Sequence, residues 1–536
     1  MLPKFTLAQI NPTVGALREN ANRIISIIDQ NDGESIVVFP ELSVLGYPPQ
    51  DLLNDSEFIQ FALEENQRII QYTEGKFAIF GSILQERNVL FNVAIIAQNG
   101  RQIATIKKRL LPRYDVFNER RYFEAGKTAN PVSINWSGEQ IRLGIEICED
   151  LWDDDYNFKV TEELIQNGAE IIINVSASPF YTGKSSRRIQ LARRKSLKTP
   201  LVYCNLIGGQ DELIFDGNSF AINEKGKLVA QLNSFEEELK EIKLTSEITE
   251  ELTLEKPEDN FRAISLGIRD YFRKSGLEKA VIGLSGGIDS AVVAVIAVDA
   301  LGKDNVTGIT MPSRFSSQHS IDDAKQLAEN LEISFLHEPI DEIFQQYLGK
   351  IKIFRKPFDT TEENIQARIR GNLLMAWANK NHAMVISTGN KTELALGYCT
   401  LYGDMSGGLA AISDLNKIEV YEIARWFNKF RGAEIIPKST VEKIPSAELA
   451  ENQIDPYDYE VVSPLVDLLI TGHFSDKALV EMGYDLSSVR ELKRQIQIFE
   501  YKRKQAAPGI RVSPKAFGIG RRMPIVNRFI RTKKGE

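Results

Sequence analysis

Cysteine is scarce in this sequence of 536 residues, with only Cys148, Cys204 and Cys399. Three widely separated cysteines are too few for a disulfide framework. Neither a CxxC pair nor an HExxH motif occurs, so a structural zinc site is not expected. We therefore expect the chain to work in a reducing compartment and predict a cytoplasmic localisation.

Long hydrophobic runs and a basic surplus are also missing. No window approaches 18 uncharged apolar residues, so a membrane span is not expected. The start, MLPKFTLAQINPTVG, lacks the basic region and the long apolar run of a signal peptide. Lys and Arg number 65 against 73 Asp and Glu, a formal net charge of −8, whereas nucleic-acid binders usually carry a basic surplus. A membrane protein and a nucleic-acid partner are both disfavoured.

The first part of the chain, residues 1–235, alternates short apolar runs with helical patterns, which favours an α/β domain. Closely spaced apolar runs between Phe77 and Ile106 resemble hairpins, so we expect some antiparallel pairing. The expected strands are Lys4–Gln9, Ser35–Phe39, Phe77–Ser82, Val93–Gln98, Ile141–Ile147, Ile171–Val175, Leu201–Asn205 and Ser219–Asn223. The expected helices are Leu17–Gln30, Glu57–Thr73, Lys159–Asn167 and Ser185–Lys198.

An acidic segment follows, residues 236–259, which holds ten acids and three lysines. We interpret it as a connector between two domains, 1–235 and 260–536, with room for one helix or strand of its own; the alternative is a solvated helix inside one domain. From residue 260 the pattern is βαβ, and right-handed crossovers would place its strands in one parallel sheet with ligands at their carboxyl ends. The expected strands are Ala280–Leu284, Val306–Met311, Ser334–Pro339 and Ala383–Thr388, and the expected helices are Phe261–Ser275, Ala291–Leu301, Ser320–Leu331 and Glu362–Asn379.

A glycine-rich turn, SGGIDS, joins a buried strand directly to an apolar helix. Its glycines let backbone N–H groups approach an anion, and the helix N-terminus adds positive potential. Asp289 would repel a phosphate unless a divalent cation lay between them, so the turn also predicts Mg²⁺. The pattern differs from a Walker A loop, which needs GxxxxGK[ST]. The predicted nucleotide-binding residues of the turn are Gly283, Leu284, Ser285, Gly286, Gly287, Ile288, Asp289 and Ser290.

This turn resembles the loop of the N-type ATP pyrophosphatases, which activate a carboxylate or carbonyl with ATP. The segments ENIQARIR (363–370), VISTGNKTELALGYCTLYGDMSGGLAAISDLNK (385–417) and PSAEL (445–449) narrow the resemblance to NAD synthetases, with a Rossmann-like, doubly wound fold. The alternative for each acid is an ordinary helix cap or surface carboxylate. The resemblance implies ATP contacts at Met311, Arg368, Thr388 and Lys417, deamido-NAD contacts at Asn364, Glu393 and Asp404, and Mg²⁺ held by Asp289 and Glu393.

The end of the chain, residues 502–536, carries eleven Lys and Arg and one acid. Alone, this charge would predict a nucleic-acid tail. Interspersed proline, glycine and apolar residues favour an ordered, packed segment over a solvated tail. NAD synthetases have a similar terminus that closes over the dinucleotide, and by that resemblance Lys515 would contact deamido-NAD.

Three polar residues of the first domain each follow an apolar strand or stand next to one: Glu41 in VVFPEL, Lys108 in KKRLLP and Cys148 in GIEICEDLW. A cysteine needs thiolate character to attack an amide, and a base with a nearby lysine supplies it. The same ammonium can stabilise the oxyanion of the intermediate. Lys107 is the alternative to Lys108, and any one of these residues could be structural alone. Cys204 has no comparable flank and is expected to be a core thiol.

The order Glu–Lys–Cys resembles the nitrilase, or carbon–nitrogen hydrolase, family, whose fold is an αββα sandwich. The resemblance implies that Glu41 is the general base, Lys108 the oxyanion-stabilising cation and Cys148 the nucleophile. It also implies glutamine-binding roles for a second set of residues. These are Tyr114, Ser178, Lys184 and Glu119. Of these, Glu119 would also be the second, supporting carboxylate of the site.

Together, the two halves resemble the glutamine-dependent NAD synthetase family over nearly the whole chain. The resemblance implies the last step of NAD biosynthesis: deamido-NAD, ATP and ammonia from L-glutamine give NAD⁺, AMP, pyrophosphate and glutamate. It also implies a homo-oligomer, often an octamer. The alternatives are an ammonia-only synthetase with an inactive amidase half, another amidotransferase of the ATP pyrophosphatase family, and a non-catalytic adenine-nucleotide sensor.

Overall fold

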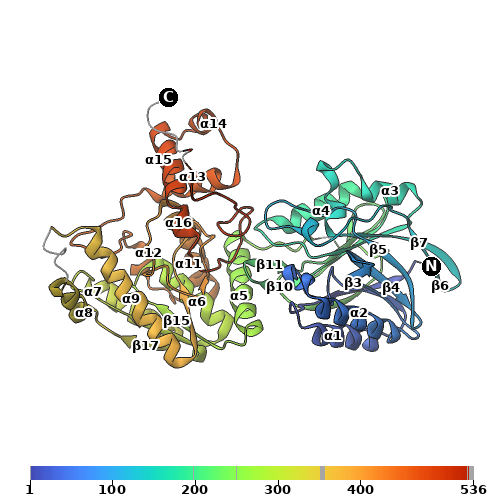
Figure 1. Cartoon of the computed structure of the whole chain (residues 1–536), viewed down its shortest axis with the longest axis horizontal. Coiled ribbons are helices and arrows are strands. Elements are labelled where there is room, and N and C mark those ends of the chain that lie inside the picture. Colours follow the sequence, from blue (N-terminus) through green and yellow to red (C-terminus); the bar gives the residue numbers. More distant parts are fainter. Residues whose placement is uncertain (1, 197, 249, 351–356, 528, 530–536) are drawn as a thin grey trace. The chain divides into compact units, whose positions relative to one another are not determined.

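The computed structural model describes residues 2–196, 198–248, 250–350, 357–527 and 529. It divides into two compact units, Met1–Leu254 and Glu255–Glu536, each with its own sheets and helices (Figure 1). The division falls inside the acidic segment 236–259. The segment includes a strand of its own, β14 (Glu238–Ile242), which pairs antiparallel with the first strand of the chain.

The first unit contains two six-stranded mixed sheets. In each sheet three neighbouring strands are parallel, and antiparallel strands extend the sheet on both sides. The antiparallel pairs that follow Phe77 agree with the hairpins expected from the sequence. The first sheet is ordered β14-β1-β2-β3-β4-β5, with β1 (Lys4–Gln9), β2 (Ser35–Val38), β3 (Phe77–Glu86), β4 (Val89–Gln98) and β5 (Arg101–Lys107). The second is ordered β13-β12-β9-β8-β7-β6, with β6 (Val132–Trp136), β7 (Glu139–Ile147), β8 (Ile171–Ser176), β9 (Leu201–Asn205), β12 (Phe220–Ile222) and β13 (Leu228–Gln231). A separate hairpin consists of β10 (Ile207–Gln210) and β11 (Leu213–Asp216).

Four layers follow from the alternation of side chains along these strands. Ile36 and Val38 of β2 point into the core between the two sheets, whereas Val37 points into the core under the outer helices. On β8, Ile173 points between the sheets and Ile172 points outward. Helices α1 (Leu17–Gln30) and α2 (Ser56–Gln71) cover the first sheet, and α3 (Val160–Gln166) and α4 (Lys184–Lys195) cover the second (Figure 1). The predicted αββα sandwich is confirmed.

The second unit is built on a five-stranded parallel sheet with the order β17-β16-β15-β18-β19. In chain order this is 3-2-1-4-5, the doubly wound pattern, whose switch point lies between β15 and β18. The predicted Rossmann-like fold is confirmed. The strands are β15 (Lys279–Gly283), β16 (Val306–Thr310), β17 (Ser334–His337), β18 (Ala383–Ser387) and β19 (Leu409–Ala410).

Helices cover both faces of this sheet. The face that presents Val281 and Ile309 packs against α8 (Asp341–Lys350) and α9 (Thr360–Asn381). The other face packs against α6 (Ile288–Leu301), which also contacts α5 (Lys256–Lys274), α7 (Gln318–Leu331) and α11 (Lys417–Arg431). The remaining helices are α10 (Lys391–Leu396), α12 (Lys438–Glu442), α13 (Tyr459–Thr471), α14 (Asp476–Glu481), α15 (Leu486–Ile498) and α16 (Glu500–Arg503).

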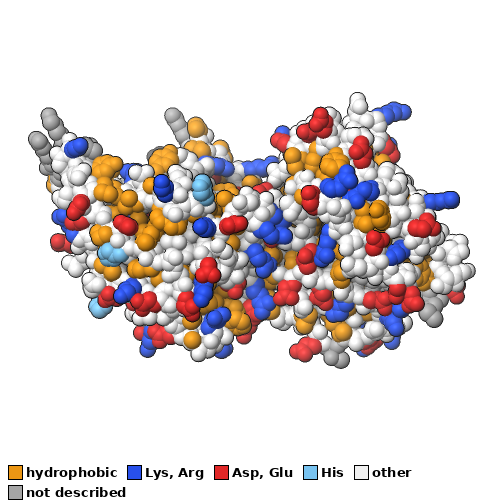
Figure 2. Space-filling model, turned by 90° about the horizontal axis from the view of Figure 1, so that it is seen from below, with side chains coloured by type: hydrophobic (Ala, Val, Ile, Leu, Met, Phe, Trp, Pro, Cys, Tyr) orange, Lys and Arg blue, Asp and Glu red, His pale blue; other side chains and the backbone are white. Residues whose placement is uncertain are grey.

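In the described parts of the chain, no helix combines the length and the apolar character needed to cross a bilayer. Acidic and basic side chains occur together across the face seen in Figure 2.

Candidate active sites

Three segments bring Glu41, Lys108 and Cys148 together in the first unit. Glu41 follows β2, Lys108 follows β5, and Cys148 follows β7. The backbone at Cys148 has a φ of +45°, in the left-handed region that residues other than glycine seldom adopt. Strain of this kind at a buried thiol is typical of a functional turn.

The ammonium of Lys108 lies between two buried carboxylates. Its Nζ is 2.6 Å from Oε1 of Glu41 and 2.8 Å from Oε1 of Glu119, and the Lys108 side chain is 1% exposed. Glu41 also accepts hydrogen bonds from Asn92 Nδ2 at 2.7 Å and from the backbone N–H of Ala177 at 3.0 Å. The carboxylate of Glu41 is therefore held in one position.

Burial and charge set the protonation states of this site. Burial disfavours the charged form of Lys108, but the charges of Glu119 and Glu41 outweigh it, so the pKa of Lys108 is well above its usual value. Burial and the charge of Glu41 raise the pKa of the Cys148 thiol, although Lys108 opposes them. The lysine is therefore charged and the thiol protonated at neutral pH, so attack by Cys148 requires a base to take its proton.

Glu119 completes the arrangement. Burial raises the pKa of its carboxyl group against the opposing effect of Lys108. Its Oε1 also accepts a hydrogen bond of 2.8 Å from the hydroxyl of Tyr47. Glu119 thus contacts Lys108 rather than open solvent, which fits the supporting carboxylate expected from the sequence.

The other predicted glutamine contacts lie on segments around Cys148. The Tyr114 hydroxyl is 3.0 Å from both carboxylate oxygens of Glu149. Ser178 is buried and binds the guanidinium of Arg188 through both its hydroxyl and its carbonyl oxygen. Lys184 begins α4 and donates to the carbonyl of Pro179 at 2.8 Å.

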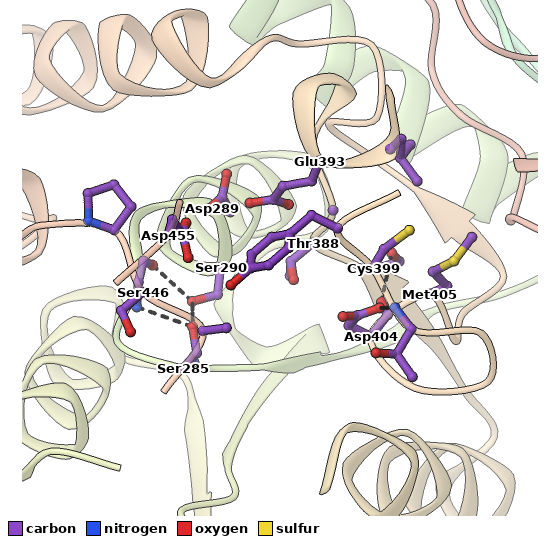
Figure 3. Close-up of a pocket in the computed structure, with 18 of the residues that line it drawn as sticks. Ser285, Asp289, Ser290, Thr388, Glu393, Cys399, Asp404, Met405, Ser446 and Asp455 are labelled. Carbon is purple, nitrogen blue, oxygen red and sulfur yellow. Dashed lines mark hydrogen bonds between the residues drawn. The ribbon is translucent and has the colours of Figure 1, made fainter. Parts of the chain in front are cut away.

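In the second unit, the SGGIDS turn connects β15 to α6 at the switch point of the sheet. Gly286 has a φ of +74°, and a Cβ there would lie 2.1 Å from the carbonyl oxygen of Ser320. The hydroxyls of Ser285 and Ser290 are 3.2 Å apart, and both contact the backbone of Gly287 (Figure 3). The turn therefore presents hydroxyls and backbone N–H groups at the start of a helix, as an anion site requires.

A second lysine between two carboxylates lies beside this turn. Lys417 Nζ is 2.5 Å from Asp289 and 3.1 Å from Glu393. Asn390 caps α10 and donates to the other oxygen of Asp289 at 2.8 Å. Burial raises the pKa of Glu393 to about 7 despite Lys417. Burial acts against the charge of Lys417, but Asp289 and Glu393 outweigh it and raise its pKa.

Two adjoining cavities, of about 310 Å³ and 250 Å³, lie at the carboxyl ends of the strands. They share Ser285, Gly287, Thr388 and Asp404. The larger contains Asp289, Glu393 and Lys417, and Figure 3 shows the first two among its lining side chains. The smaller is lined by residues at the ends of β15 and β16, among them the apolar side chains of Leu284, Ile309 and Met311.

Most residues predicted for this half line these cavities. Met311 lies in the smaller one, and Asn364 in the larger one, where its side-chain oxygen accepts from Thr400 Oγ1 at 2.7 Å. Three predicted residues line neither: Gly286, Arg368 and Lys515. Arg368 is exposed, and its Nε donates to the carbonyl of Leu401 at 3.2 Å. Lys515 also lies outside both linings, and its carbonyl accepts from Ser513.

Sequence reasoning missed several lining residues. Arg370, two positions after Arg368, lines the smaller cavity and donates to the carbonyl of Met311 at 2.9 Å. Lys443 lines both cavities, and its Nζ lies 3.2 Å from the carbonyl of Gly286. Lys502 also lines the larger cavity, so the basic end of the chain does reach it. The PSAEL run (445–449) was the sequence feature that indicated this side of the cavities, since its Ser446 lines both of them.

The carboxylates of Asp289 and Glu393 fit a magnesium ion that takes its other ligands from the substrate. Among the described residues, no group of three or more His, Cys, Asp and Glu forms a complete metal site. Asp289 and Glu393 nevertheless approach one point, since both contact the Nζ of Lys417. Mg²⁺ characteristically takes one or two protein carboxylates and completes its shell with substrate phosphates and water.

The fold and the two sites define a class: a carbon–nitrogen hydrolase unit and an NAD synthase unit in one chain. Residues 4–252 match the carbon-nitrogen hydrolase family and residues 260–506 match the NAD synthase family. The chain belongs to the glutamine-dependent NAD(+) synthetase family, as its relatives show. The resemblance of the sequence to the glutamine-dependent NAD synthetases is thereby confirmed.

Three relatives illustrate this similarity. The glutamine-dependent NAD(+) synthetase of Synechocystis sp. is 42% identical over 559 residues, covering 98% of this chain and 99% of its own. That of Thermotoga maritima is 40% identical with the same coverage. A solved structure, glutamine-dependent NAD+ synthetase from Acinetobacter baumannii in complex with adenosine diphosphate, has 33% identity and a TM-score of 0.76 and covers 98% of both chains.

Proposed function

We propose that this chain converts deamido-NAD to NAD⁺ with ATP, using ammonia that its first unit releases from L-glutamine. The observation that carries the proposal is the contact of Lys108 with Glu41 and Glu119 beside Cys148, in a chain whose second unit holds Asp289, Glu393 and Lys417 beside a phosphate-binding turn. Neither a nucleotide sensor nor an ammonia-only enzyme needs both arrangements.

In the first unit, Cys148 is the nucleophile. As its sulfur bonds to the amide carbon of glutamine, Glu41 takes the thiol proton, because the raised pKa of Cys148 keeps the thiolate scarce. Lys108 stabilises the negative oxygen of the tetrahedral intermediate. Glu41 then returns the proton to the leaving nitrogen, and ammonia departs from a thioester.

Water completes this half-reaction. Glu41 takes a proton from the attacking water, the bond between carbon and sulfur breaks, and glutamate leaves with the thiol restored. Glu119 holds Lys108 in place through both steps. Tyr114, Ser178 and Lys184 are proposed to hold the amino-acid end of glutamine.

In the second unit, the smaller cavity is proposed to take the adenosine of ATP, beside Met311 and Arg370, with the phosphates at Ser285–Ser290. Thr388 and Lys417 would also contact ATP. The nicotinate carboxylate of deamido-NAD, held near Asn364 and Asp404, attacks the α-phosphate and releases pyrophosphate. Ammonia then attacks the resulting acyl-adenylate, and AMP leaves.

Asp289 and Glu393 would hold Mg²⁺, which would neutralise charge on the phosphates when bound. Lys417 also brings positive charge to that point from the protein itself. A homo-oligomer, an octamer in many family members, and a cytoplasmic location stay predictions from the family resemblance. Light scattering after size-exclusion chromatography tests the oligomer.

Product analysis with glutamine, ATP, Mg²⁺ and deamido-NAD tests the proposal. We expect NAD⁺, AMP, pyrophosphate and glutamate in equal amounts. Cys148→Ala should abolish glutamine-supported synthesis and keep ammonium-supported synthesis. Unchanged glutamine use in that variant would refute the glutaminase assignment. No turnover of deamido-NAD by the unmodified chain would refute the synthetase assignment.

A further inference from the structure

A buried lysine of the second unit has no part in the mechanism above. Lys391 has an exposed fraction of 0% and lines neither cavity. Its Nζ lies 3.0 Å from Oδ1 of Asp414 and 2.8 Å from Oδ1 of Asp467, and it donates to the hydroxyl of Ser513 at 2.9 Å. The ammonium therefore binds acceptors from three separate segments of the chain.

Lys391 is also the first residue of α10, the helix whose start carries two groups of the site. The preceding residue, Asn390, caps the helix and donates to Asp289 at 2.8 Å. Two positions after Lys391, Glu393 contacts Lys417 at 3.1 Å. A single helical turn thus joins the buried ammonium to both groups, so a displacement of Lys391 would displace them as well.

The same lysine is linked to the start of α11, the helix that begins at Lys417. Asp467 binds the ammonium of Lys391 through one oxygen, and its other oxygen accepts from Nδ2 of Asn416, the cap of α11, at 2.6 Å. The backbone N–H of Lys391 also donates to the carbonyl of Leu415 at 2.8 Å. These contacts set the distance between the two helix starts whose side chains meet beside the phosphate-binding turn.

The C-terminal segment reaches Lys391 as well. Asp414 accepts from the backbone N–H groups of Val512 and Ser513 at 2.8 Å and 2.7 Å. The hydroxyl of Ser513 then accepts from the ammonium of Lys391. The basic end of the chain is therefore attached to α10 through a buried carboxylate and a buried ammonium.

A buried ion pair is an inefficient way to gain stability. Desolvation of the two charges offsets most of their attraction, and apolar side chains of similar volume often stabilise a fold as well or better. A buried ammonium instead supplies direction, because its hydrogen bonds restrict its position more narrowly than an apolar contact does. Supporting contacts of this kind matter most where a binding group must be held closely in place.

We infer that Lys391 is a positioning residue: by holding the start of α10 against α11, it places Glu393 for the binding of ATP with Mg²⁺ and does not touch the nucleotide itself. The inference rests on the proposed function, in which this part of the second unit binds ATP and Mg²⁺. A lysine with a purely structural role would change the amount of folded chain. A positioning lysine changes the affinity of the chain that is folded.

The test measures the dissociation constant of ATP in the presence of Mg²⁺ by isothermal titration calorimetry on the full-length chain, which requires no turnover. In Lys391→Met we expect this constant to rise about tenfold, because coupling within one ion-pair network commonly amounts to such a factor. Asp467→Asn keeps the lysine and alters a side chain that is 32% exposed, so this variant should fold. It should raise the constant about three- to tenfold, and it carries the test where Lys391→Met does not fold.

A second background shows whether the effect passes through Glu393. Glu393→Gln removes the charge of that carboxylate and should itself weaken the binding of ATP with Mg²⁺. Adding Lys391→Met or Asp467→Asn to Glu393→Gln should raise the dissociation constant by less than about twofold more, since the placement of an uncharged side chain matters less. A structural defect would instead add the same factor in both backgrounds.

The matched control is Asp476→Asn. Asp476 starts α14, lines neither cavity and forms ion pairs with Lys493 at 2.6 Å and Arg490 at 3.4 Å. Loss of this carboxylate removes an ion pair of the second unit and should leave the dissociation constant of ATP within about 1.5-fold of that of the unmodified chain. Thermal unfolding curves and glutamine hydrolysis by the first unit report whether each variant is folded.

An unchanged dissociation constant in folded Lys391→Met or in Asp467→Asn would overturn the inference. An equal rise with and without the charge of Glu393 would overturn it too. Failure of the unmodified chain to bind ATP with Mg²⁺ would instead refute the proposed function, so the two failures produce different results.

Discussion

Substituting alanine for Gly286 tests the phosphate-binding turn most directly. Gly286 has a φ of +74°, and its missing side chain leaves space for the carbonyl oxygen of Ser320. An added Cβ would lie 2.1 Å from that oxygen and 2.7 Å from the Ser320 Cα. These are backbone atoms at the start of α7, so no side-chain rotation can relieve the contact.

The expected magnitude has two parts. A left-handed conformation costs an alanine about 1–2 kcal/mol. Relief of the contact requires a shift on the order of 1 Å by the turn or by α7, because ordinary van der Waals contact begins near 3.4 Å. A displacement of that size at a positioning group costs on the order of 100-fold in rate. We therefore expect ATP-dependent turnover to fall about 100-fold, with a lower stability of the second unit.

The matched control is Gly276→Ala. Gly276 follows α5, has a φ of +70°, and has open space where its Cβ would be. It carries the cost of the left-handed conformation without the contact, so the difference between the two variants isolates the effect at Ser320. Turnover of Gly276→Ala should stay within about threefold of the unmodified chain.

The assay is pyrophosphate release with deamido-NAD, ATP and ammonium chloride, which bypasses the first unit. Glutamine hydrolysis by the same preparations and their thermal unfolding curves show that any loss is local to the second unit. If Gly286→Ala keeps its kcat and its KM for ATP within threefold of Gly276→Ala, the assignment of this turn to the phosphates is refuted.

Three further predictions follow from named contacts. Arg370→Met should raise the KM for ATP about tenfold, because Arg370 lines the smaller cavity, and Arg368→Met should not; ATP kinetics with ammonium decide between them. Lys391→Met should lower the free energy of unfolding by about 3–5 kcal/mol, because it leaves the buried carboxylate of Asp414 without its ion pair. Urea unfolding measures this change, and an unchanged urea midpoint of unfolding would contradict the prediction. Glu149 directly follows Cys148 and accepts hydrogen bonds from the hydroxyls of Tyr114 and Tyr156, and burial raises its pKa to about 7. Its charge is therefore lost as the pH falls from 8 to 6, which should raise the KM for glutamine about tenfold in the unmodified chain and leave that of Glu149→Gln unchanged.

The sequence predicted the candidate sites best where a polar residue directly follows an apolar strand. Glu41, Cys148 and the SGGIDS turn all have this position, and parallel strands bring their carboxyl ends to one edge. A strand is short and the sheet sets its direction, so the residue that follows it is restricted to a narrow region at the edge of the sheet. The position of a residue does not identify its reaction, and the expected reactions came from the family resemblance.

Arg368 and Arg370 show where such reasoning fails. Spacing of four residues places Asn364 and Arg368 near one another on α9, but the face toward the cavities contains Asn364, Ala367 and Arg370. Both arginines are compatible with the helix pattern, since α9 is partly buried on more than one side. The choice depends on how the helix is rotated against the sheet, which tertiary packing decides.

The position of strand β14 within the acidic segment was not predicted, for a related reason. Its sequence, ELKEI, is mostly charged and exposed, so no apolar alternation marks it. It forms because β1 offers an unpaired edge, to which its backbone pairs over five residues. Edge strands with charged side chains are common, since the charge discourages pairing with another chain.

Both units place a lysine between two carboxylates, and this shared arrangement links their chemistry. Lys108 lies between Glu41 and Glu119, and Lys417 between Asp289 and Glu393, so in each cluster two acidic side chains contact one ammonium. Burial raises the pKa of Glu119 and of Glu393 against the effect of the lysine, so a further cation would favour the charged form of the second carboxyl group. For the second unit that cation would be the Mg²⁺ that accompanies ATP. In both sites the lysine would stay available for the oxygen that becomes negative during reaction.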